Sequence, residues 1–245
     1  MTTKTKIPGA GAALITGGAK RLGKAIALTL AQRGFDIAIH YNTNRNEAEA
    51  TVKEIERLGR HCRLFAGNLA DEDETKSLIP SVRKTFKNLN FLINSASIFK
   101  TSGIATRDTA LLDAHYAINL RAPYILTAGF AEQCKKGQII NILDTHITKN
   151  KTSHAGYLLS KKSLADFTKM SALHLAPRIR VNGIAPGLIL PPEGKGPGYL
   201  ARLAKNIPLR RKGSTRNITQ TVEFLLENDY LTGQIIFADG GEHLI

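Results

Sequence analysis

The sequence predicts an α/β protein built on one doubly wound parallel sheet flanked by helices. Short apolar runs alternate with longer segments of helical periodicity along nearly the whole chain. Such alternation favours a parallel sheet, because right-handed crossovers place helices on both of its faces. The length of 245 residues and the hydrophobic fraction of 42% suit a single domain with a large core. We therefore expect residues 1–245 to form one domain.

The first strand and helix illustrate the pattern. Residues 12–16 form an apolar run that ends in glycines, as a buried parallel strand does. Residues 21–33 then carry apolar side chains at helical spacing, and Gly34 ends this helix.

The later elements repeat this alternation. We expect further strands over residues 36–41, 62–66, 91–94, 138–143, 180–184 and 234–237. We expect further helices over residues 47–58, 74–86 and 155–175, and a helical region around residues 111–133.

One stretch is irregular. Prolines and glycines interrupt residues 190–198, so we expect neither helix nor strand there. A surface loop is one interpretation. Because the stretch follows a strand end, where ligands of such sheets bind, residues 188–206 are also a candidate substrate lid.

The composition of the chain bears on which classes of molecule the protein binds. The net charge is +14, but the lysines and arginines are spread along the chain, and the cluster Arg210-Arg211-Lys212 lacks flanking aromatics. We expect no nucleic-acid partner, and either a solvated basic surface or one that attracts an anionic cofactor or substrate.

The remaining composition favours a cytoplasmic protein. We expect no membrane partner, since no long apolar run suggests a span, and the first ten residues lack the apolar stretch of a signal peptide. Cys62 and Cys134 form no metal-binding pattern, so we expect incidental or buried thiols and no metal.

Tyr157 and Lys161 are four residues apart in a predicted helix. Residues at this spacing lie on one helix face, one turn apart. A nearby ammonium favours the phenolate, so we expect Lys161 to lower the pKa of Tyr157 and make it a proton donor near neutral pH. The alternative is a solvated helix face.

A glycine-rich turn, residues 16–23, joins the first strand to the first helix. Glycines such as Gly17, Gly18 and Gly23 let a backbone approach a pyrophosphate at the positive helix N-terminus. An ordinary strand–helix turn is the alternative, but the position in the first βα unit favours a dinucleotide.

The end of the second strand bears on which dinucleotide binds. An acidic residue there holds the ribose diol of NAD, whereas this chain has no acid between His40 and Glu47. Polar groups and Arg45 would accept a 2′-phosphate, so we expect NADPH. The residues concerned are Tyr41, Asn42, Thr43 and Asn44.

Together these stretches resemble the short-chain dehydrogenase/reductase family over nearly the whole chain. The matching motifs are Gly17-Gly18 with Gly23, Asn94-Ser95-Ala96, Asn119, Tyr157 with Lys161, Pro186-Gly187 and Asp239-Gly240-Gly241. Asn68-Leu69 differs from the Asp-Leu that the family places at the adenine, and the asparagine oxygen could still accept from the adenine amine.

The resemblance implies a Rossmann-type fold, a homotetramer and a set of cofactor contacts. These contacts are Gly17, Arg21, Leu22, Gly23, Tyr41, Asn42, Thr43, Asn44, Asn68, Leu69, Asn94, Ala96, Tyr157, Lys161, Pro186 and Gly187.

Three departures narrow the resemblance to the pteridine reductases, including the bacterial dihydromonapterin and dihydrofolate reducing branch. Asp144 stands where most family members have a serine, Arg21 replaces the middle glycine, and Phe99 follows the Asn94-Ser95-Ala96 motif. A carboxylate would repel a developing alkoxide but suits proton delivery to a ring nitrogen. A strand-end cap is the alternative for Asp144, a core position for Phe99 and a solvated helix position for Arg21.

The resemblance thus implies NADPH-dependent reduction of a pterin C=N bond. The implied catalytic residues are Asp144, Tyr157, Lys161 and Asn119, where Asn119 keeps a helix and a relay water in place. The implied substrate contacts are Arg21, Ser97, Phe99, Asp144, Tyr157 and Leu188. The alternatives are a 3-oxoacyl-carrier-protein ketoreductase of the same family and a non-enzymatic dinucleotide-sensing protein.

Overall fold

The computed structural model describes residues 10–105, 109–192, 194, 196 and 198–245. Seven parallel strands form one sheet in the order β3-β2-β1-β4-β5-β6-β7. They are β1 (Ala12–Ile15), β2 (Asp36–Tyr41), β3 (Cys62–Ala66), β4 (Leu89–Asn94), β5 (Gly137–Ile142), β6 (Ile179–Pro186) and β7 (Ile235–Ala238). The strand order reverses between β1 and β4, and ligands of such sheets bind at this switch point, beyond the carboxyl ends.

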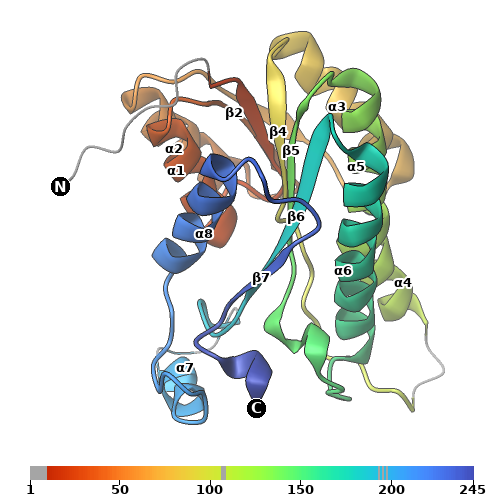
Figure 1. Ribbon diagram of the computed structural model, residues 1–245, viewed down its shortest axis with the longest axis vertical. Helices are drawn as coiled ribbons and strands as arrows, with labels where there is room; N and C mark the ends of the chain where they lie inside the picture. Colours follow the sequence, from red (N-terminus) through yellow and green to blue (C-terminus); the bar gives the residue numbers. More distant parts are fainter. Residues whose placement is uncertain (1–9, 106–108, 193, 195, 197) are drawn as a thin grey trace.

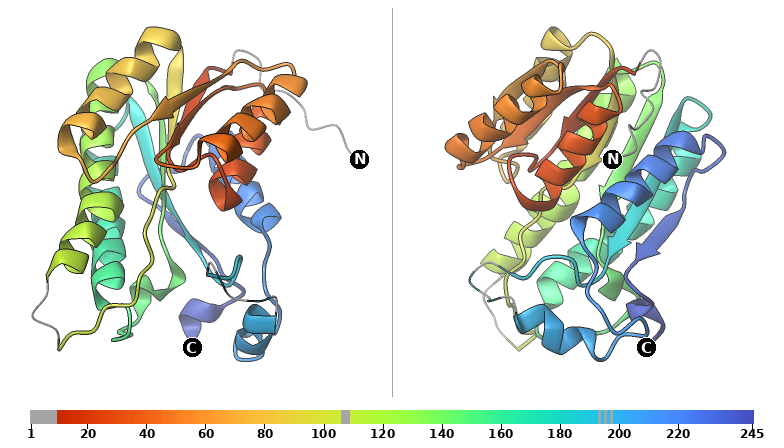
Figure 2. Two further views of the ribbon diagram at one scale, coloured as in Figure 1. Left: turned by 180° about the vertical axis from the view of Figure 1, so that it is seen from behind. Right: turned by 90° about the vertical axis from the view of Figure 1, so that its left-hand side faces the viewer.

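Helices cover both faces of the sheet (Figure 1, Figure 2). One layer contains α1 (Arg21–Gln32), α2 (Arg45–Arg57) and α8 (Thr215–Glu227). The other contains α3 (Glu72–Thr85), α4 (Ala110–Tyr116), α5 (Ala122–Gln133) and α6 (Ala155–Leu175). The predicted fold class is therefore confirmed.

Two apolar cores result from the alternation of side chains along each strand. Ala13 and Ile15 of β1 pack into one core, and Ala12 and Leu14 into the other. Because both faces are covered, the strands are mostly apolar, which made them visible in the sequence.

The helical region expected around residues 111–133 is present, but it is not one continuous helix. It divides into α4, the π-helical turn η1 (Ala117–Arg121) and α5, which has a proline in its first turn. A proline cannot donate a backbone hydrogen bond, and π-helical turns are frequent at functional sites.

Two helices were missed. The short helix α7 (Gly198–Ala204) lies in the candidate lid segment, and α8 begins after the capping box of Ser214 and Asn217. The cap and the apolar spacing of Ile218, Val222 and Leu225 were signals for α8 that the sequence analysis did not use.

Two 3₁₀ turns, η2 (Thr145–Thr148) and η3 (Glu242–Leu244), complete the described structure. Among the described residues, no helix has both the length and the apolar character needed to cross a bilayer. The expectation about a signal peptide concerns residues 1–10, of which 1–9 lie outside the described residues. Cys62 and Cys134 are free and buried, as expected.

Candidate active site

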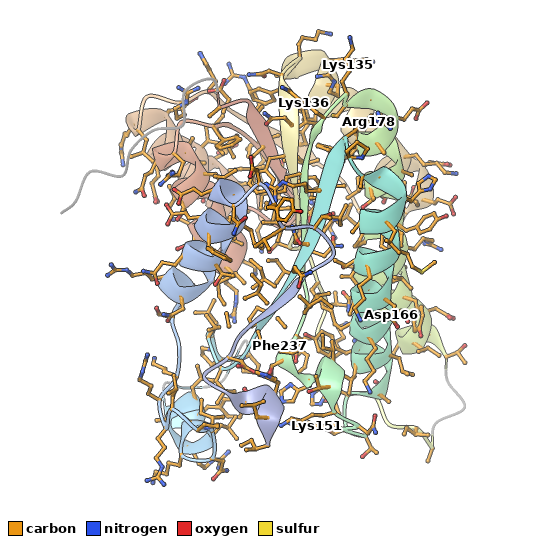
Figure 3. The ribbon with its side chains drawn as sticks, viewed as in Figure 1. Lys135, Lys136, Lys151, Asp166, Arg178 and Phe237 are labelled. Atoms are coloured by element: carbon orange, nitrogen blue, oxygen red, sulfur yellow. The ribbon has the colours of Figure 1, made fainter. Side chains whose placement is uncertain are left out.

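The candidate site lies beyond the carboxyl ends of the strands. In Figure 3, Lys135, Lys136 and Arg178 mark the amino ends of β5 and β6, whereas Lys151 and Phe237 lie toward the opposite end. The buried hydroxyl of Thr16 ties β1 to β4 there, since it accepts from Ser95 N at 2.9 Å and Ala96 N at 3.0 Å. Asn94 Nδ2 donates to Asn141 Oδ1 at 2.8 Å and links β4 to β5.

The glycine-rich turn has the geometry of a close-approach site. Gly17 has a φ of 64°, and a Cβ on Gly23 would lie 2.2 Å from Gly17 O. The N-terminus of α1 carries no side-chain cap from Lys20 and no acidic residue in its first turn. Its backbone N–H groups and dipole therefore favour an anion.

Arg21 occupies the left-handed region, with a φ of 53°. Glycine adopts this conformation without strain, which gives a physical reason why the family has a glycine here. Arg21 Nη2 donates to Pro191 O at 2.5 Å, so the arginine joins the glycine-rich turn to the 188–206 segment. Leu22 is half-buried behind it.

His40 supports this turn, and the sequence analysis missed it. Gly17 N donates to His40 Nδ1 at 3.3 Å, and His40 Nε2 lies 3.0 Å from Gly67 O. One nitrogen accepts while the other donates, so the ring is neutral. Burial lowers the pKa of His40, in keeping with this tautomer.

The end of β2 contains no carboxylate between Tyr41 and Asn46. Arg45 is 74% exposed and pairs with Glu49 at 2.8 Å, so it is bound to its own helix in this structure. Asn42 and Thr43 are exposed, and Tyr41 and Asn44 are half-buried.

The Asn68-Leu69 position has a different arrangement. Asn68 Oδ1 accepts from Ala70 N at 3.0 Å, which leaves the oxygen one further lone pair. Leu69 is buried in the core beneath the turn.

Asp144 and Tyr157 meet at the end of β5. Tyr157 is buried near the start of α6, and its hydroxyl donates to Asp144 Oδ2 at 2.7 Å. Asp144 also caps η2, because its Oδ1 accepts from His146 N at 2.8 Å. The strand-end cap and the tyrosine partner are therefore two functions of one carboxylate.

The expectation that Lys161 lowers the pKa of Tyr157 is wrong in this structure. Burial, followed by the charge and the hydrogen bond of Asp144, raises the pKa of Tyr157 well above its ordinary value. Lys161 lies on the same helix face, but its Nζ is 6.0 Å from the tyrosine ring centroid and donates to Ile142 O at 2.7 Å. Burial lowers the pKa of Lys161 to about 8, against a smaller opposing effect of Asp144.

Asn119 lies at the centre of η1 and is fully buried. Its Nδ2 donates to Ile98 O and Ser160 Oγ, both at 3.1 Å, and its Oδ1 accepts from Ile98 N at 3.0 Å and Ser97 Oγ at 3.1 Å. These four bonds use the full capacity of the amide. The side-chain amide of Asn119 therefore holds the loop after β4 against α6 and has no further capacity for the water that the resemblance implies.

Phe99 is not a core residue, since 49% of it is exposed. One face stacks on His154 with centroids 4.4 Å apart, and the ring lies edge-on to Tyr157 at 4.7 Å. An aromatic surface therefore lies directly beside the tyrosine.

Pro186 ends β6, and a Cβ on Gly187 would lie 2.7 Å from Asp239 Cα. This close contact fixes the turn that leads into half-buried Leu188.

Comparisons with known proteins bear on the family of this chain. The family described as Enoyl-(Acyl carrier protein) reductase matches residues 17–243. The 3-oxoacyl-[acyl-carrier-protein] reductase FabG of Staphylococcus aureus is 31% identical over 240 residues, which cover 95% of this chain and 98% of the relative.

The chain belongs to the short-chain dehydrogenase/reductase family.

Two solved structures of the family are also similar. The FolM alternative dihydrofolate reductase 1 from Brucella canis, complexed with NADP, is 35% identical with a TM-score of 0.90, and the match covers 96% of this chain and 95% of that one. The Brucella suis protein of the same description, also with NADP, is 35% identical with a TM-score of 0.91, covering 100% of this chain and 97% of that one.

In this short-chain dehydrogenase/reductase the structure brings Asp144, Tyr157, Lys161 and Phe99 together. Two features were not expected from the sequence: Arg45 pairs with Glu49, and the lid segment contains a helix with buried Leu200. Residues 193, 195 and 197 of that segment lie outside the described residues.

Proposed function

We propose that this short-chain reductase uses NADPH to reduce a C=N bond of a pterin, of the dihydropteridine or dihydrofolate type. The observation that carries the proposal is the 2.7 Å hydrogen bond from Tyr157 to Asp144. This carboxylate stands where a carbonyl-polarising serine is usual in the family. An ionised carboxylate only accepts hydrogen bonds, so it cannot polarise a ketone oxygen as a hydroxyl does.

The residues present fit NADPH. The pyrophosphate would lie on the backbone of Gly17 to Gly23 at the uncapped N-terminus of α1. The end of β2 has no carboxylate to repel a 2′-phosphate, and exposed Arg45 could exchange Glu49 for it. When bound, NADPH supplies the hydride for the pterin carbon. Both FolM structures contain NADP.

Tyr157 supplies the proton in this proposal. Its raised pKa keeps the hydroxyl protonated at neutral pH, and its hydrogen bond to Asp144 fixes the position of the phenolic oxygen. For the transfer, the hydroxyl hydrogen turns from Asp144 to the ring nitrogen of the substrate. Transfer leaves a phenolate, which the nearby ammonium of Lys161 stabilises. Lys161 would also hold the nicotinamide ribose, as the family resemblance implies.

The substrate would stack on Phe99. Its exposed ring lies next to Tyr157, so a flat heterocycle placed on it has a ring nitrogen near the proposed acid. Ser97, Arg21 and Leu188 complete the proposed contacts. The resemblance to the family further implies a homotetramer, and we place the protein in the cytoplasm as part of this proposal.

Ketone reduction is the second candidate, because FabG is 31% identical over 95% of the chain. One experiment separates the two: NADPH oxidation followed with dihydrobiopterin, dihydrofolate and acetoacetyl thioesters side by side. The pterin proposal expects the highest kcat/KM with one of the pterins. A preference for the acetoacetyl thioester would replace it with the ketoreductase function, and no turnover of any of the three would favour a dinucleotide-sensing protein.

A further inference from the structure

A histidine lies behind the Asp144–Tyr157 pair, on the side away from the tyrosine. His146 Nδ1 is 2.7 Å from Asp144 Oδ1, and the backbone N–H of His146 donates to the same oxygen at 2.8 Å. Tyr157 uses the other oxygen. Asp144 is thus held by donors at both oxygens, as an ionised carboxylate prefers.

Glu242 holds the opposite side of this imidazole. Its Oε1 lies 3.1 Å from His146 Nε2, and its side chain is only 9% exposed. Glu242 Oε2 has no hydrogen-bond partner among the described residues. A buried carboxylate needs a compensating cation, and His146 is the group in contact with it.

The protonated form of His146 follows from these two carboxylates. Burial lowers the pKa of His146, but the hydrogen bonds to Asp144 and Glu242 outweigh it and bring the pKa to about 9. The same ring acts back on Asp144. Burial would raise the pKa of Asp144, but the bonds and charge of His146, with the Tyr157 hydroxyl, hold it below its ordinary value.

Two other charged or titratable groups face His146. Lys151 Nζ lies 2.6 Å from Nε2, where an ammonium can donate only to the neutral ring, so it competes with Glu242. We favour the protonated ring, because carboxylates lie at both of its nitrogens whereas Lys151 is on an exposed loop (Figure 3). The second group is His154, whose own pKa is lowered by burial and, to a smaller extent, by the charge of His146.

The turn η3, which carries Glu242, is fastened to η2 by further bonds. Lys149 Nζ donates to Glu242 O at 2.7 Å, and Thr145 Oγ1 donates to Asp239 Oδ2 at 2.5 Å. The position of Glu242 is therefore defined by the fold.

We propose that His146 and Glu242 are positioning residues of the active site: the imidazole, held between the two carboxylates, keeps Asp144 ionised and its Oδ2 directed at Tyr157. The C-terminal turn is then part of the apparatus that orients the proton donor. This inference rests on the proposed function in one respect, that Tyr157 delivers the proton.

Removal of the His146 imidazole should therefore change the pH at which Asp144 takes up a proton. Without the imidazole, its hydrogen bond and charge no longer oppose burial, and the pKa of Asp144 rises. Protonated Asp144 no longer accepts the Tyr157 hydroxyl as a carboxylate does, so turnover falls on the acid side.

The test compares wild type, His146→Ala, His146→Asn and the matched control His243→Gln. His243 also pairs with a carboxylate, Asp239 at 2.8 Å, in the same turn but has no contact with Asp144. We expect the acid limb of kcat in His146→Ala to move upward by about 1 pH unit or more, with the KM for NADPH unchanged. His146→Asn, whose amide can still donate to Oδ1, should recover part of kcat at pH 7.5. The control should keep the wild-type limb.

A second measurement needs no substrate. The titration of His146 by NMR, assigned by its absence in His146→Ala, should give a pKa near 9 in wild type. Glu242→Gln should lower this pKa, and Lys151→Gln should raise it. Thermal melts identify variants that fail to fold. If His146→Ala fails to fold, the Glu242→Gln and Lys151→Gln variants still test the inference through the pKa of His146.

Each outcome decides a part of the inference. The role of His146 is overturned if folded His146→Ala has the same acid limb of kcat as wild type. The role of Glu242 is overturned if the pKa of His146 is unchanged in Glu242→Gln. If no pterin is reduced but the His146 pKa shifts as expected in the Glu242 and Lys151 variants, the positions of His146 and Glu242 are supported and the proposed function fails. The kcat profile is then measured with whichever substrate the wild type reduces.

Discussion

Asp144 shows how one side chain can serve structure and chemistry together. Its Oδ1 caps η2, and its Oδ2 accepts from Tyr157. The two oxygens face different partners because the chain turns directly after β5. Substitutions at this position therefore test catalysis only when stability is measured beside it.

Replacement of Tyr157 by phenylalanine should nearly abolish turnover. The hydroxyl is the proposed acid, whereas the ring only packs against Phe99 and His115. We expect kcat to fall by about 10²–10⁴-fold, the usual contribution of general acid catalysis. The dissociation constant of NADPH, from fluorescence titration, should remain close to wild type. A variant that retains most of its turnover would exclude Tyr157 as the acid.

Replacement of Asp144 by serine separates pterin from ketone reduction. We expect dihydropterin turnover to drop sharply and weak activity on a simple ketone to rise, because a hydroxyl can donate to a carbonyl oxygen. Phe99→Ala is the contrasting variant. It should raise the pterin KM through lost stacking, on the order of 1–3 kcal/mol by analogy with bases on aromatics, and leave kcat largely intact. Unchanged pterin turnover in Asp144→Ser would mean that Asp144 only caps η2 and has no part in the reaction.

Between elements, the neutral ring of His40 connects three parts of the cofactor side. It extends from β2 to the glycine-rich turn at Gly17 and to Gly67 after β3. A protonated ring would present an N–H to the N–H of Gly17, which removes the bond.

The cofactor site should consequently weaken at low pH. Burial lowers the pKa of His40, so below its ordinary value of about 6.5 the unfolded chain takes up a proton that the folded chain resists. Stability from this group is present above that pH and is lost as the pH falls. We expect a lower melting temperature and a higher NADPH dissociation constant at pH 5.5 than at 7.5. His40→Gln, which cannot titrate, should show a smaller difference; an equal one would contradict the assignment.

The end of β2 should select NADPH over NADH. It offers no carboxylate to the ribose diol, and Arg45 lies one residue beyond Asn44. We expect a clear preference for NADPH in kcat/KM, reduced by Arg45→Glu. Equal efficiencies with the two cofactors in wild type would refute this interpretation.

At the scale of the whole molecule, the outer face of the α4–α5–α6 layer is unusually apolar. Met170 and Leu173 on α6 are 67% and 85% exposed, and Tyr124 on α5 is 58% exposed. Large apolar side chains grouped on a helical face are typical of subunit contacts. We propose that this face is a subunit contact of the homotetramer that the family resemblance implies.

Leu173→Glu should therefore shift the assembly toward smaller species. A buried, unpaired carboxylate in a subunit contact is strongly unfavourable. Sedimentation or light scattering of wild type and variant would measure the change, with Leu58→Glu on the other layer as the control. A wild-type protein that is monomeric would exclude the assembly itself.

Local patterns in the sequence determined most of the fold. The bounds of β2, β3 and α6 match the expected ranges, because apolar periodicity and glycine stops are properties of neighbouring residues. The capped helix α8 was equally readable from its sequence. The division of residues 110–133 by a π-helical turn was not, since periods of 3.6 and 4.4 residues differ little over so short a segment.

The chemical state of the site depended on the tertiary structure. The sequence identified Tyr157, Lys161 and Asp144, but the pKa of Tyr157 moves opposite to the expected direction, because desolvation depends on what the fold buries around it. His146 and Glu242 come from distant parts of the chain and meet only when η3 packs on η2. Residue identities are thus set locally, whereas charge states follow from contacts and burial that exist only in the folded chain.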